Sequence, residues 1–169
     1  MEEMWKPIPG FPNYSVSSEG KVRNEARGRI VRTSVTLQGA VKVGLVDEHI
    51  QRTRSVKLLV ADQFVKGRTE LYNTPIHLDG DQQNCSADNL LWRPRWFAQK
   101  YKIQLQYINE YTGVGPIMVR KTGVVHSDIV EAALTYGVLF YEIQLSLVNK
   151  IHVFPTWQIY DWVKGDNVV

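Results

Sequence analysis

The sequence has a single cysteine, Cys85, among its 169 residues. This excludes an internal disulfide and a zinc cluster built from several cysteines. The apolar runs are far shorter than the roughly 20 residues that a helix needs to cross a membrane. The N-terminus lacks the basic segment and apolar stretch of a signal peptide, so we expect none. We therefore expect a cytoplasmic protein with no membrane partner.

The net charge is also small. The 20 lysines and arginines exceed the 17 aspartates and glutamates by only three, which does not by itself indicate a nucleic-acid partner. The distribution is uneven, because residues 21–57 hold nine basic and three acidic side chains, whereas residues 103–169 hold four and six. A DNA-binding surface is therefore expected in residues 21–57, and a solvated basic face is the alternative.

Residues 75–92 contain the most distinctive chemistry. His77 ends a short apolar run and is followed by Asp79-Gly80-Asp81, which predicts a tight turn. Asn89 returns about twelve residues later, at the start of an expected helix. This spacing allows the asparagine amide to reach back and fix the imidazole ring. A histidine oriented in this way can take a proton from water.

This segment resembles the core of the HNH (ββα-metal) nucleases found in phage homing endonucleases. The pattern is His77-x-Asp79-Gly80-x(3)-Asn84-x(4)-Asn89-Leu90-x-Trp92, and residues 59–64 resemble the short helix that precedes this core. The resemblance implies that His77 is the general base and that Asn89 orients it. Relatives usually carry histidine where this chain has Lys57.

A second resemblance covers residues 5–22. They match Trp-x-x-Ile-x-Gly-(Phe/Tyr)-x-x-Tyr-x-Val-Ser-x-x-Gly-x-Val, the pattern of a small module that often precedes HNH domains in phage endonucleases. Tyr14 and Val16 alternate with serines, so we expect a strand there and a second strand from Lys21 to Arg23. The large apolar residues would form the core of the module, and Lys21 and Arg23 would be free to contact phosphate.

Residues 28–46 alternate between apolar and polar around Gly39, which predicts a β-hairpin. Its inner face would hold Val35 and Leu37 with the apolar residues of 41–45. Its outer face would carry Arg29, Arg32 and Lys42. A basic two-stranded ribbon of this kind fits a DNA groove, and the sequence does not indicate which groove.

Two helices are expected in the nuclease-like segment. The first runs over 56–65, is capped by Ser55, and directs Leu58, Leu59, Ala61 and Phe64 inward. The second lies within residues 93–104, with Trp96 and Phe97 packed inward and a basic side facing out.

Residues 113–163 predict a separate module. We expect strands at 117–119 and 124–126, a helix over 128–136 capped by Ser127, a second helix over 139–148, and a last strand at 157–160. This order resembles the small DNA-binding repeats at the C-termini of homing endonucleases and predicts a helix-turn-helix. The alternative is a helical hairpin that packs on the nuclease core or on a second copy. In such a helix-turn-helix, the exposed residues expected to contact DNA bases are Tyr141, Gln144, Asn149 and Lys150.

The metal site departs from the family. The resemblance implies one ligand immediately before the base, where this chain has Ile76, and another nine residues after Asn89, where it has Ala98. Neither side chain binds an ion. The remaining candidate ligands are Asp79, Asp81 and Gln99. We therefore expect Mg²⁺ or another divalent ion only if the chain is active, and otherwise no cofactor.

The sequence thus predicts an α+β protein with three parts: a β-rich DNA-binding module at 1–54, an HNH-like ββα core at 55–104 and a helix-turn-helix-like module at 105–169. The leading hypothesis is a double-stranded DNA-binding protein in which cleavage is impaired or lost, in the host cytoplasm if a phage encodes it. The alternatives are an active metal-dependent endonuclease or nickase, and a protein-interaction or inhibitory factor that contacts a partner or a second copy through the C-terminal module. The expected DNA contacts are Lys21, Arg23, Arg29, Arg32, Arg52, Arg54, Arg93, Arg95 and Lys100.

Overall fold

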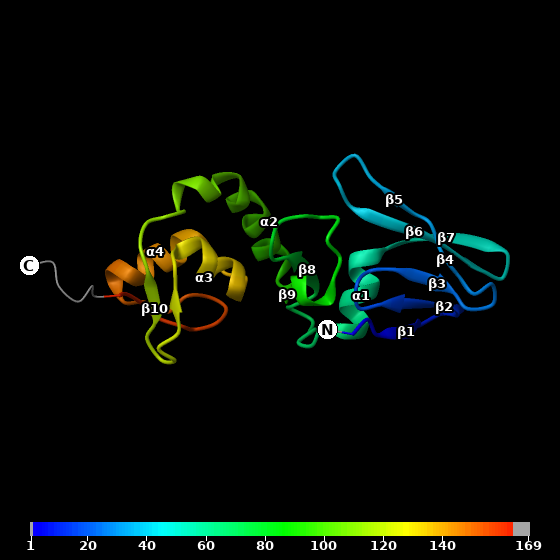
Figure 1. Cartoon of the computed structure of the whole chain (residues 1–169), viewed down its shortest axis with the longest axis horizontal. Helices are drawn as coiled ribbons and strands as arrows, with labels where there is room; N and C mark the ends of the chain where they lie inside the picture. Colours follow the sequence, from blue (N-terminus) through cyan, green and yellow to red (C-terminus); the bar gives the residue numbers. More distant parts are fainter. Residues whose placement is uncertain (1, 164–169) are drawn as a thin grey trace, which may run out of the picture. The chain divides into compact units, whose positions relative to one another are not determined.

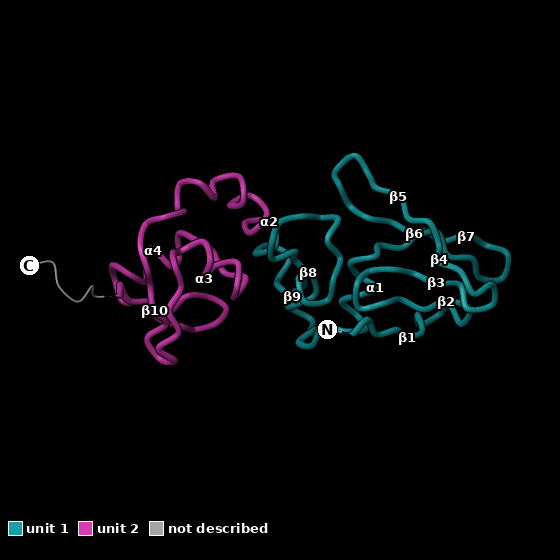
Figure 2. Tube along the Cα trace, viewed as in Figure 1, with its two compact units in different colours: residues 1–98 teal, residues 99–169 magenta. Residues whose placement is uncertain are grey.

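The computed structural model describes residues 2–163. The chain divides into two compact units, residues 1–98 and 99–169 (Figure 2). The first unit is rich in β-structure and the second in helices, as Figure 1 shows, so the predicted α+β class is confirmed. The division predicted at residues 54 and 104 differs from these compact units and stays a prediction. Within residues 2–163, no helix has the length and apolar character needed to span a bilayer.

The first unit contains two antiparallel sheets, a helix and a ββ pair. One sheet has the order β1-β2-β3-β4 and the other has the order β5-β6-β7. The elements are β1 (Trp5–Ile8), β2 (Phe11–Ser17), β3 (Val22–Asn24), β4 (Arg29–Ile30), β5 (Thr33–Val35), β6 (Val41–Asp47), β7 (Ile50–Ser55), α1 (Val56–Phe64), β8 (Thr74–His77), the 3-10 turn η1 (Ala87–Asn89), β9 (Leu90–Arg93) and α2 (Arg95–Gln104), whose last residues belong to the second unit.

One hydrophobic core serves the whole first unit. Val16 and Val22 from the first sheet, Leu45 from the second sheet, Val60 from α1 and Trp92 from β9 are all buried in the same cluster. The indole N–H of Trp92 also donates a 3.0 Å hydrogen bond to the carbonyl of Val65, just after α1. The ββα segment is therefore packed directly against the N-terminal sheets.

Several predicted packing positions in this unit are wrong. Ala61 is buried as predicted, and Leu59 and Phe64 pack against the core, but Leu58 is 40% exposed and α1 also buries Val56 and Val60. Ser55 occupies the N-cap position, but its side chain makes no capping hydrogen bond. Trp96 is 51% exposed while its neighbour Phe97 is fully buried. Leu58 and Trp96 thus lie at the edge of helix faces whose other predicted core positions are correct.

The hairpin around Gly39 forms, but with a different inner face. Val43 and Leu45 are buried as predicted, whereas Val35 is 52% exposed and Leu37 is fully exposed. Arg29 lies on β4 in the other sheet and not on this ribbon.

The second unit places a three-stranded sheet, with the order β11-β10-β12, against two helices. Asp128, not the predicted Ser127, caps α3: its Oδ1 accepts a 2.9 Å hydrogen bond from the N–H of Glu131, and the Glu131 carboxylate accepts one from Ser127 N–H. The last strand lies at 160–162 instead of 157–160. The elements are η2 (Leu105–Glu110), β10 (Ile117–Val119), β11 (Val125–His126), α3 (Ile129–Tyr136), α4 (Phe140–Asn149) and β12 (Tyr160–Trp162).

Candidate functional site

His77 is the last residue of β8 and lies opposite Leu90 of β9. Its side chain is only 7% exposed, and its Nε2 atom is buried without a hydrogen-bond partner. Burial lowers the pKa of this imidazole to about 4, and the positive charge of Lys57 acts in the same direction, whereas Asp79 and Asp81 raise it. His77 is therefore a neutral imidazole at neutral pH.

Asn89 lies at the end of η1, where the chain enters β9, and not at the start of a helix. Its side-chain Oδ1 accepts a 3.0 Å hydrogen bond from the backbone N–H of Asp79. Its Nδ2 donates 2.8 Å to the Asp79 carboxylate and 2.9 Å to the carbonyl of Asn84. The buried amide is thus fully used in closing the loop that begins after His77.

The sequence predicted that this amide would fix the imidazole directly. In the structure it holds the backbone of the following loop, and the Asn89 carbonyl accepts a 2.9 Å hydrogen bond from Leu78 N–H. His77 is positioned by the β8–β9 pairing and by burial among its neighbours. The two predicted catalytic residues are therefore close in the fold, and their side chains are not bonded to each other.

The predicted metal ligands are occupied by contacts within the loop. Asp79 Oδ1 accepts hydrogen bonds from Asp81 N–H and from the Asn89 amide, and Asp79 Oδ2 accepts from Asn84. Burial opposes ionisation of Asp79, but these donors outweigh it and hold the carboxyl pKa below its usual value. Asp81 accepts a bond from Gln83 N–H through Oδ1.

These side chains do not fit a divalent-ion site. Ile76 is a buried apolar residue beside the base, and Ala98 offers no donor atom. Gln99 is an exposed residue of α2. Across residues 2–163, no group of three or more His, Cys, Asp or Glu side chains is placed to hold a metal ion. A magnesium ion needs several oxygen ligands in octahedral order, whereas Asp79 is a single carboxylate that already accepts three hydrogen bonds from its loop.

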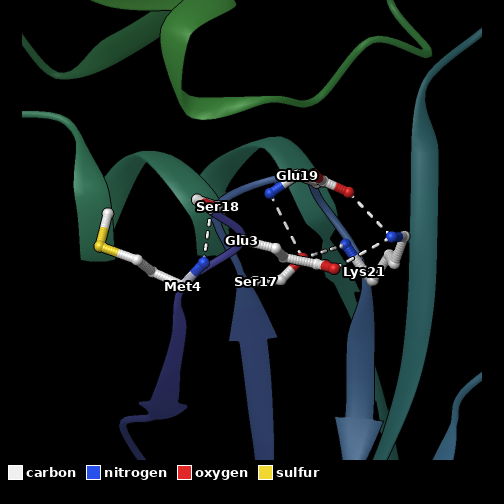
Figure 3. Close-up of polar contacts among 6 residues, drawn as sticks. All are labelled: Glu3, Met4, Ser17, Ser18, Glu19 and Lys21. Carbon is white, nitrogen blue, oxygen red and sulfur yellow. Dashed lines mark hydrogen bonds and ion pairs between the residues drawn. The ribbon is translucent and has the colours of Figure 1, made fainter. Parts of the chain in front are cut away.

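Two of the predicted DNA contacts are neutralised by carboxylates. Figure 3 shows Lys21 Nζ between Glu19, at 2.8 Å, and Glu3, at 3.1 Å. Arg23 bonds the Glu25 carboxylate through two nitrogens and stacks its guanidinium on the Trp5 ring at 4.3 Å. Both cations therefore offer less attraction to phosphate than their sequence positions suggested.

The remaining predicted contacts fall into two groups. Arg93 is buried, donates to the Trp92 carbonyl and lies over the Phe97 ring, and Arg54 lies over the Phe11 ring. The other group is exposed and comprises Arg29, Arg32, Arg52 and Arg95, together with Lys100 on the second unit. Among residues 2–163, the four arginines of this group form no ion pair with a carboxylate.

Lys57 was not chosen as a site residue from the sequence, yet it acts electrostatically on His77. It lies in the first turn of α1, and its charge lowers the pKa of His77 and favours ionisation of the buried Cys85 thiol, although burial raises that thiol pKa overall. The signal available in the sequence was its position, where the resemblance implies a histidine. A cation at this position disfavours the protonated form of the base.

The second unit joins α3 and α4 by three residues. The first, Gly137, adopts a left-handed conformation with φ 59°, and the unit buries Ala133 and Ile143 on either side of the turn. Gln104 accepts a 2.8 Å hydrogen bond from Phe140 N–H and donates 3.1 Å to the Val138 carbonyl. Lys150, one of the expected reading residues, pairs with Asp161 at 2.8 Å.

Comparison with known proteins agrees with this geometry. Residues 3–45 match the NUMOD4 motif. Two uncharacterized HNH endonucleases of Acanthamoeba polyphaga mimivirus are 30% identical over 107 residues and 33% identical over 92 residues, covering 63% and 54% of this chain. The DNA endonuclease I-HmuI of Bacillus phage SP01 is 31% identical over 103 residues, or 60% of this chain.

The chain spans 27% of the length of each mimivirus relative and 56% of that of the phage enzyme. A solved structure, described as DNA binding and cleavage by the HNH homing endonuclease I-HmuI, is similar in fold over 96% of this chain and 99% of that one. Its TM-score is 0.55 and its sequence identity is 21%. The predicted resemblance to HNH homing endonucleases is thus confirmed.

Proposed function

We propose that this chain, which resembles HNH homing endonucleases, binds double-stranded DNA and has weak or no ability to cleave it. One observation carries the first half of the proposal: Arg29, Arg32, Arg52 and Arg95 are exposed and, within residues 2–163, unpaired with carboxylates. Cations of this kind bind phosphates by releasing counterions from the duplex. The compartment we propose is the cytoplasm, that of the host if a phage encodes the chain.

The side chains around His77 support the second part of the proposal, that the chain cleaves DNA weakly or not at all. Strand cleavage by this fold needs a base and a divalent ion on the scissile phosphate. The residues near His77 do not fit such an ion, and a base with a pKa of about 4 is weak at neutral pH. We therefore assign no cleavage step to this site.

A salt titration tests the binding half. Fluorescence anisotropy with a labelled duplex is expected to show affinity that falls steeply between about 50 and 200 mM salt. Replacing Arg29, Arg32 and Arg52 with alanine is expected to reduce the slope of log K against log salt by about 0.9 for each phosphate group that is no longer bound. Lys21→Ala is the matched control, because its charge is already compensated by two carboxylates. An equal effect of Lys21→Ala would contradict the proposed surface.

A second candidate function is an active metal-dependent endonuclease or nickase with His77 as base. The unpartnered Nε2 of His77 favours it, because that atom is held ready for a further partner. This activity would need Mg²⁺ or another divalent ion held by ligands other than those the resemblance implies. Cleavage of supercoiled plasmid in Mg²⁺ or Mn²⁺ that disappears in His77→Ala would establish it in place of our first choice.

If no duplex binds at about 50 mM salt, where phosphate contacts are strong, the DNA proposal fails. Both DNA-dependent hypotheses would then be excluded, and a protein-interaction role would be left. The second unit is its proposed contact region, and sedimentation of the full chain would reveal self-association through it.

A further inference from the structure

The tip of the β5–β6 hairpin is a small, ordered loop. Thr36 N–H donates a 2.9 Å hydrogen bond to the Ala40 carbonyl, and Gly39 N–H donates 2.8 Å to the Thr36 carbonyl. The Thr36 hydroxyl also accepts a 3.1 Å bond from Ala40 N–H. Gly39 has φ +86°, a conformation that glycine adopts without strain. The two residues at the very end, Leu37 and Gln38, are therefore presented on a fixed turn.

Both side chains at the tip are open to solvent. Leu37 is fully exposed, and Gln38 beside it is also exposed. The nine residues from 33 to 41 contain no charged side chain, although they lie inside the most basic part of the chain. Arg32 and Lys42 stand immediately before and after them. Figure 1 shows this hairpin as a projecting loop of the first unit.

The arrangement matches the layout of a duplex. Phosphates line the outside of DNA and are bound by cations, whereas base edges lie within the grooves. A tip without charged side chains attracts phosphate less strongly than Arg32 and Lys42, which come just before and just after this neutral segment in the sequence. An apolar side chain complements the C5 methyl of thymine, and a glutamine amide complements N6 and N7 of adenine. Both groups face the major groove, which is wide enough for a two-stranded ribbon.

We propose that Leu37 and Gln38 form a reading tip that contacts an A·T base pair in the major groove, with Leu37 against the thymine methyl and Gln38 on adenine. The inference rests on the proposed binding of duplex DNA and adds to it a base preference and the residues that produce it.

The hairpin tip lies near the loop that follows His77. A methyl group placed on Gly39 would lie 3.6 Å from Cβ of Gln82, in ordinary van der Waals contact. The Gln82 carbonyl in turn accepts the weak hydrogen bond of the Cys85 thiol.

Removal of single groups from the DNA tests the assignment. Anisotropy at about 50 mM salt would compare short duplexes of alternating A·T pairs, the same duplexes with deoxyuridine in place of thymidine, and others with 7-deazaadenine in place of adenine. Deoxyuridine lacks only the methyl group. Because one buried methyl changes an equilibrium by about fourfold, wild-type protein is expected to bind the uracil duplex about fourfold more weakly.

Variants assign the effect to the tip. Leu37→Ala is expected to bind the thymine and uracil duplexes equally, and Gln38→Ala to become insensitive to 7-deazaadenine. Ile50→Ala is the matched control, since Ile50 is another exposed apolar residue, at the start of β7, and it should keep the fourfold preference.

Two results would overturn the reading tip while leaving the proposed function in place: equal binding of thymine and uracil duplexes by the wild type, or a preference that survives in Leu37→Ala. Failure to bind any of the duplexes would instead overturn the proposed function itself. Leu37 makes no buried contact, so loss of binding through misfolding of Leu37→Ala is not expected, and circular dichroism would check this.

Discussion

The side-chain amide of Asn89 donates a 2.8 Å hydrogen bond to the carboxylate of Asp79, ten residues earlier in the chain. The same amide accepts a bond from the backbone of Asp79 and donates to the carbonyl of Asn84. In this chain the pattern that resembles a catalytic pair thus serves first to close a loop. The loop is closed through the very carboxylate that would be the nearest candidate ligand for an ion.

Removing this amide should destabilise the first unit. Asn89→Ala removes three hydrogen bonds to the Asp79 and Asn84 groups of the loop, and each such bond is worth about 0.5–1.5 kcal/mol. We expect a loss of about 2 kcal/mol in the free energy of unfolding, measured by urea denaturation. Asn13→Ala is the control, because Asn13 is exposed and its side chain makes no hydrogen bond within residues 2–163. A loss no greater than that of the control would contradict this role.

Restoring oxygen ligands should restore metal binding. We expect the double variant Ile76→Asp, Ala98→Asn to bind Mn²⁺ more tightly than wild type, because it supplies side-chain oxygens at the two positions that the resemblance implies. The readouts are calorimetric titration and thermal unfolding, in which ion at 100 times its Kd adds about 2.7 kcal/mol. Ile76 is buried, so the aspartate should destabilise the protein without metal.

The single variants serve as controls in that experiment, and each should gain less affinity than the pair. If the double variant gains no affinity for Mn²⁺, the alignment of residues 76 and 98 with the family ligands is wrong.

The buried imidazole of His77 should make stability depend on pH. Its folded pKa of about 4 lies below the unfolded value of about 6.5, so the unfolded chain binds the proton more tightly. Its contribution is complete above pH 6.5 and is lost as the pH falls toward 4. Across that window we expect a loss of about 2–3 kcal/mol, smaller than the full shift implies because solvent still reaches part of the site.

Urea denaturation at several pH values between 7 and 4 measures this effect. His77→Gln should flatten the profile, whereas His49→Asn, in an exposed turn where asparagine tolerates the positive φ of 68°, should leave it unchanged. An unaltered profile in His77→Gln would show that other groups produce the pH dependence.

Gln104 should stabilise the turn between α3 and α4. Its amide bonds both Val138 and Phe140, so Gln104→Ala leaves the first N–H of α4 and a carbonyl of the turn without these partners. We expect a loss of about 1–2 kcal/mol in the unfolding of the second unit. Gln99→Ala, an exposed position, is the control and should change stability by less than about 0.5 kcal/mol.

The sequence predicted where helices and strands lie better than it predicted which of their side chains face the core. Alternation at Tyr14 and Val16 located β2, and the apolar pattern located α1 within a residue. Leu58 and Trp96 were placed on the wrong side because hydrophobicity does not say which of several apolar faces meets the core. Asp128 displaced Ser127 as the helix cap because both residues are good caps and only the backbone geometry selects one.

The electrostatics of the site were harder still to predict. Nothing in the local sequence joins Lys21 to Glu3, since that ion pair depends on β1 lying beside β2 and β2 beside β3. The carboxylate of Asp79 was a reasonable ligand candidate until its hydrogen-bond partners were known. The sequence pattern was enough to show that the segment around His77 resembles an HNH core. The hydrogen-bond partners of its polar atoms could be found only from the three-dimensional structure.

The hydrophobic core shared by the N-terminal sheets and the ββα segment constrains how this chain could have been assembled. An exchange of gene segments that joined or cut the chain near residue 54 would leave Val60 and Trp92 facing water on one fragment and Val16 and Leu45 on the other. Residues 1–98 would therefore be inherited as one block. Shuffling of parts between related genes should instead succeed at a junction within α2, where the two compact units meet in sequence.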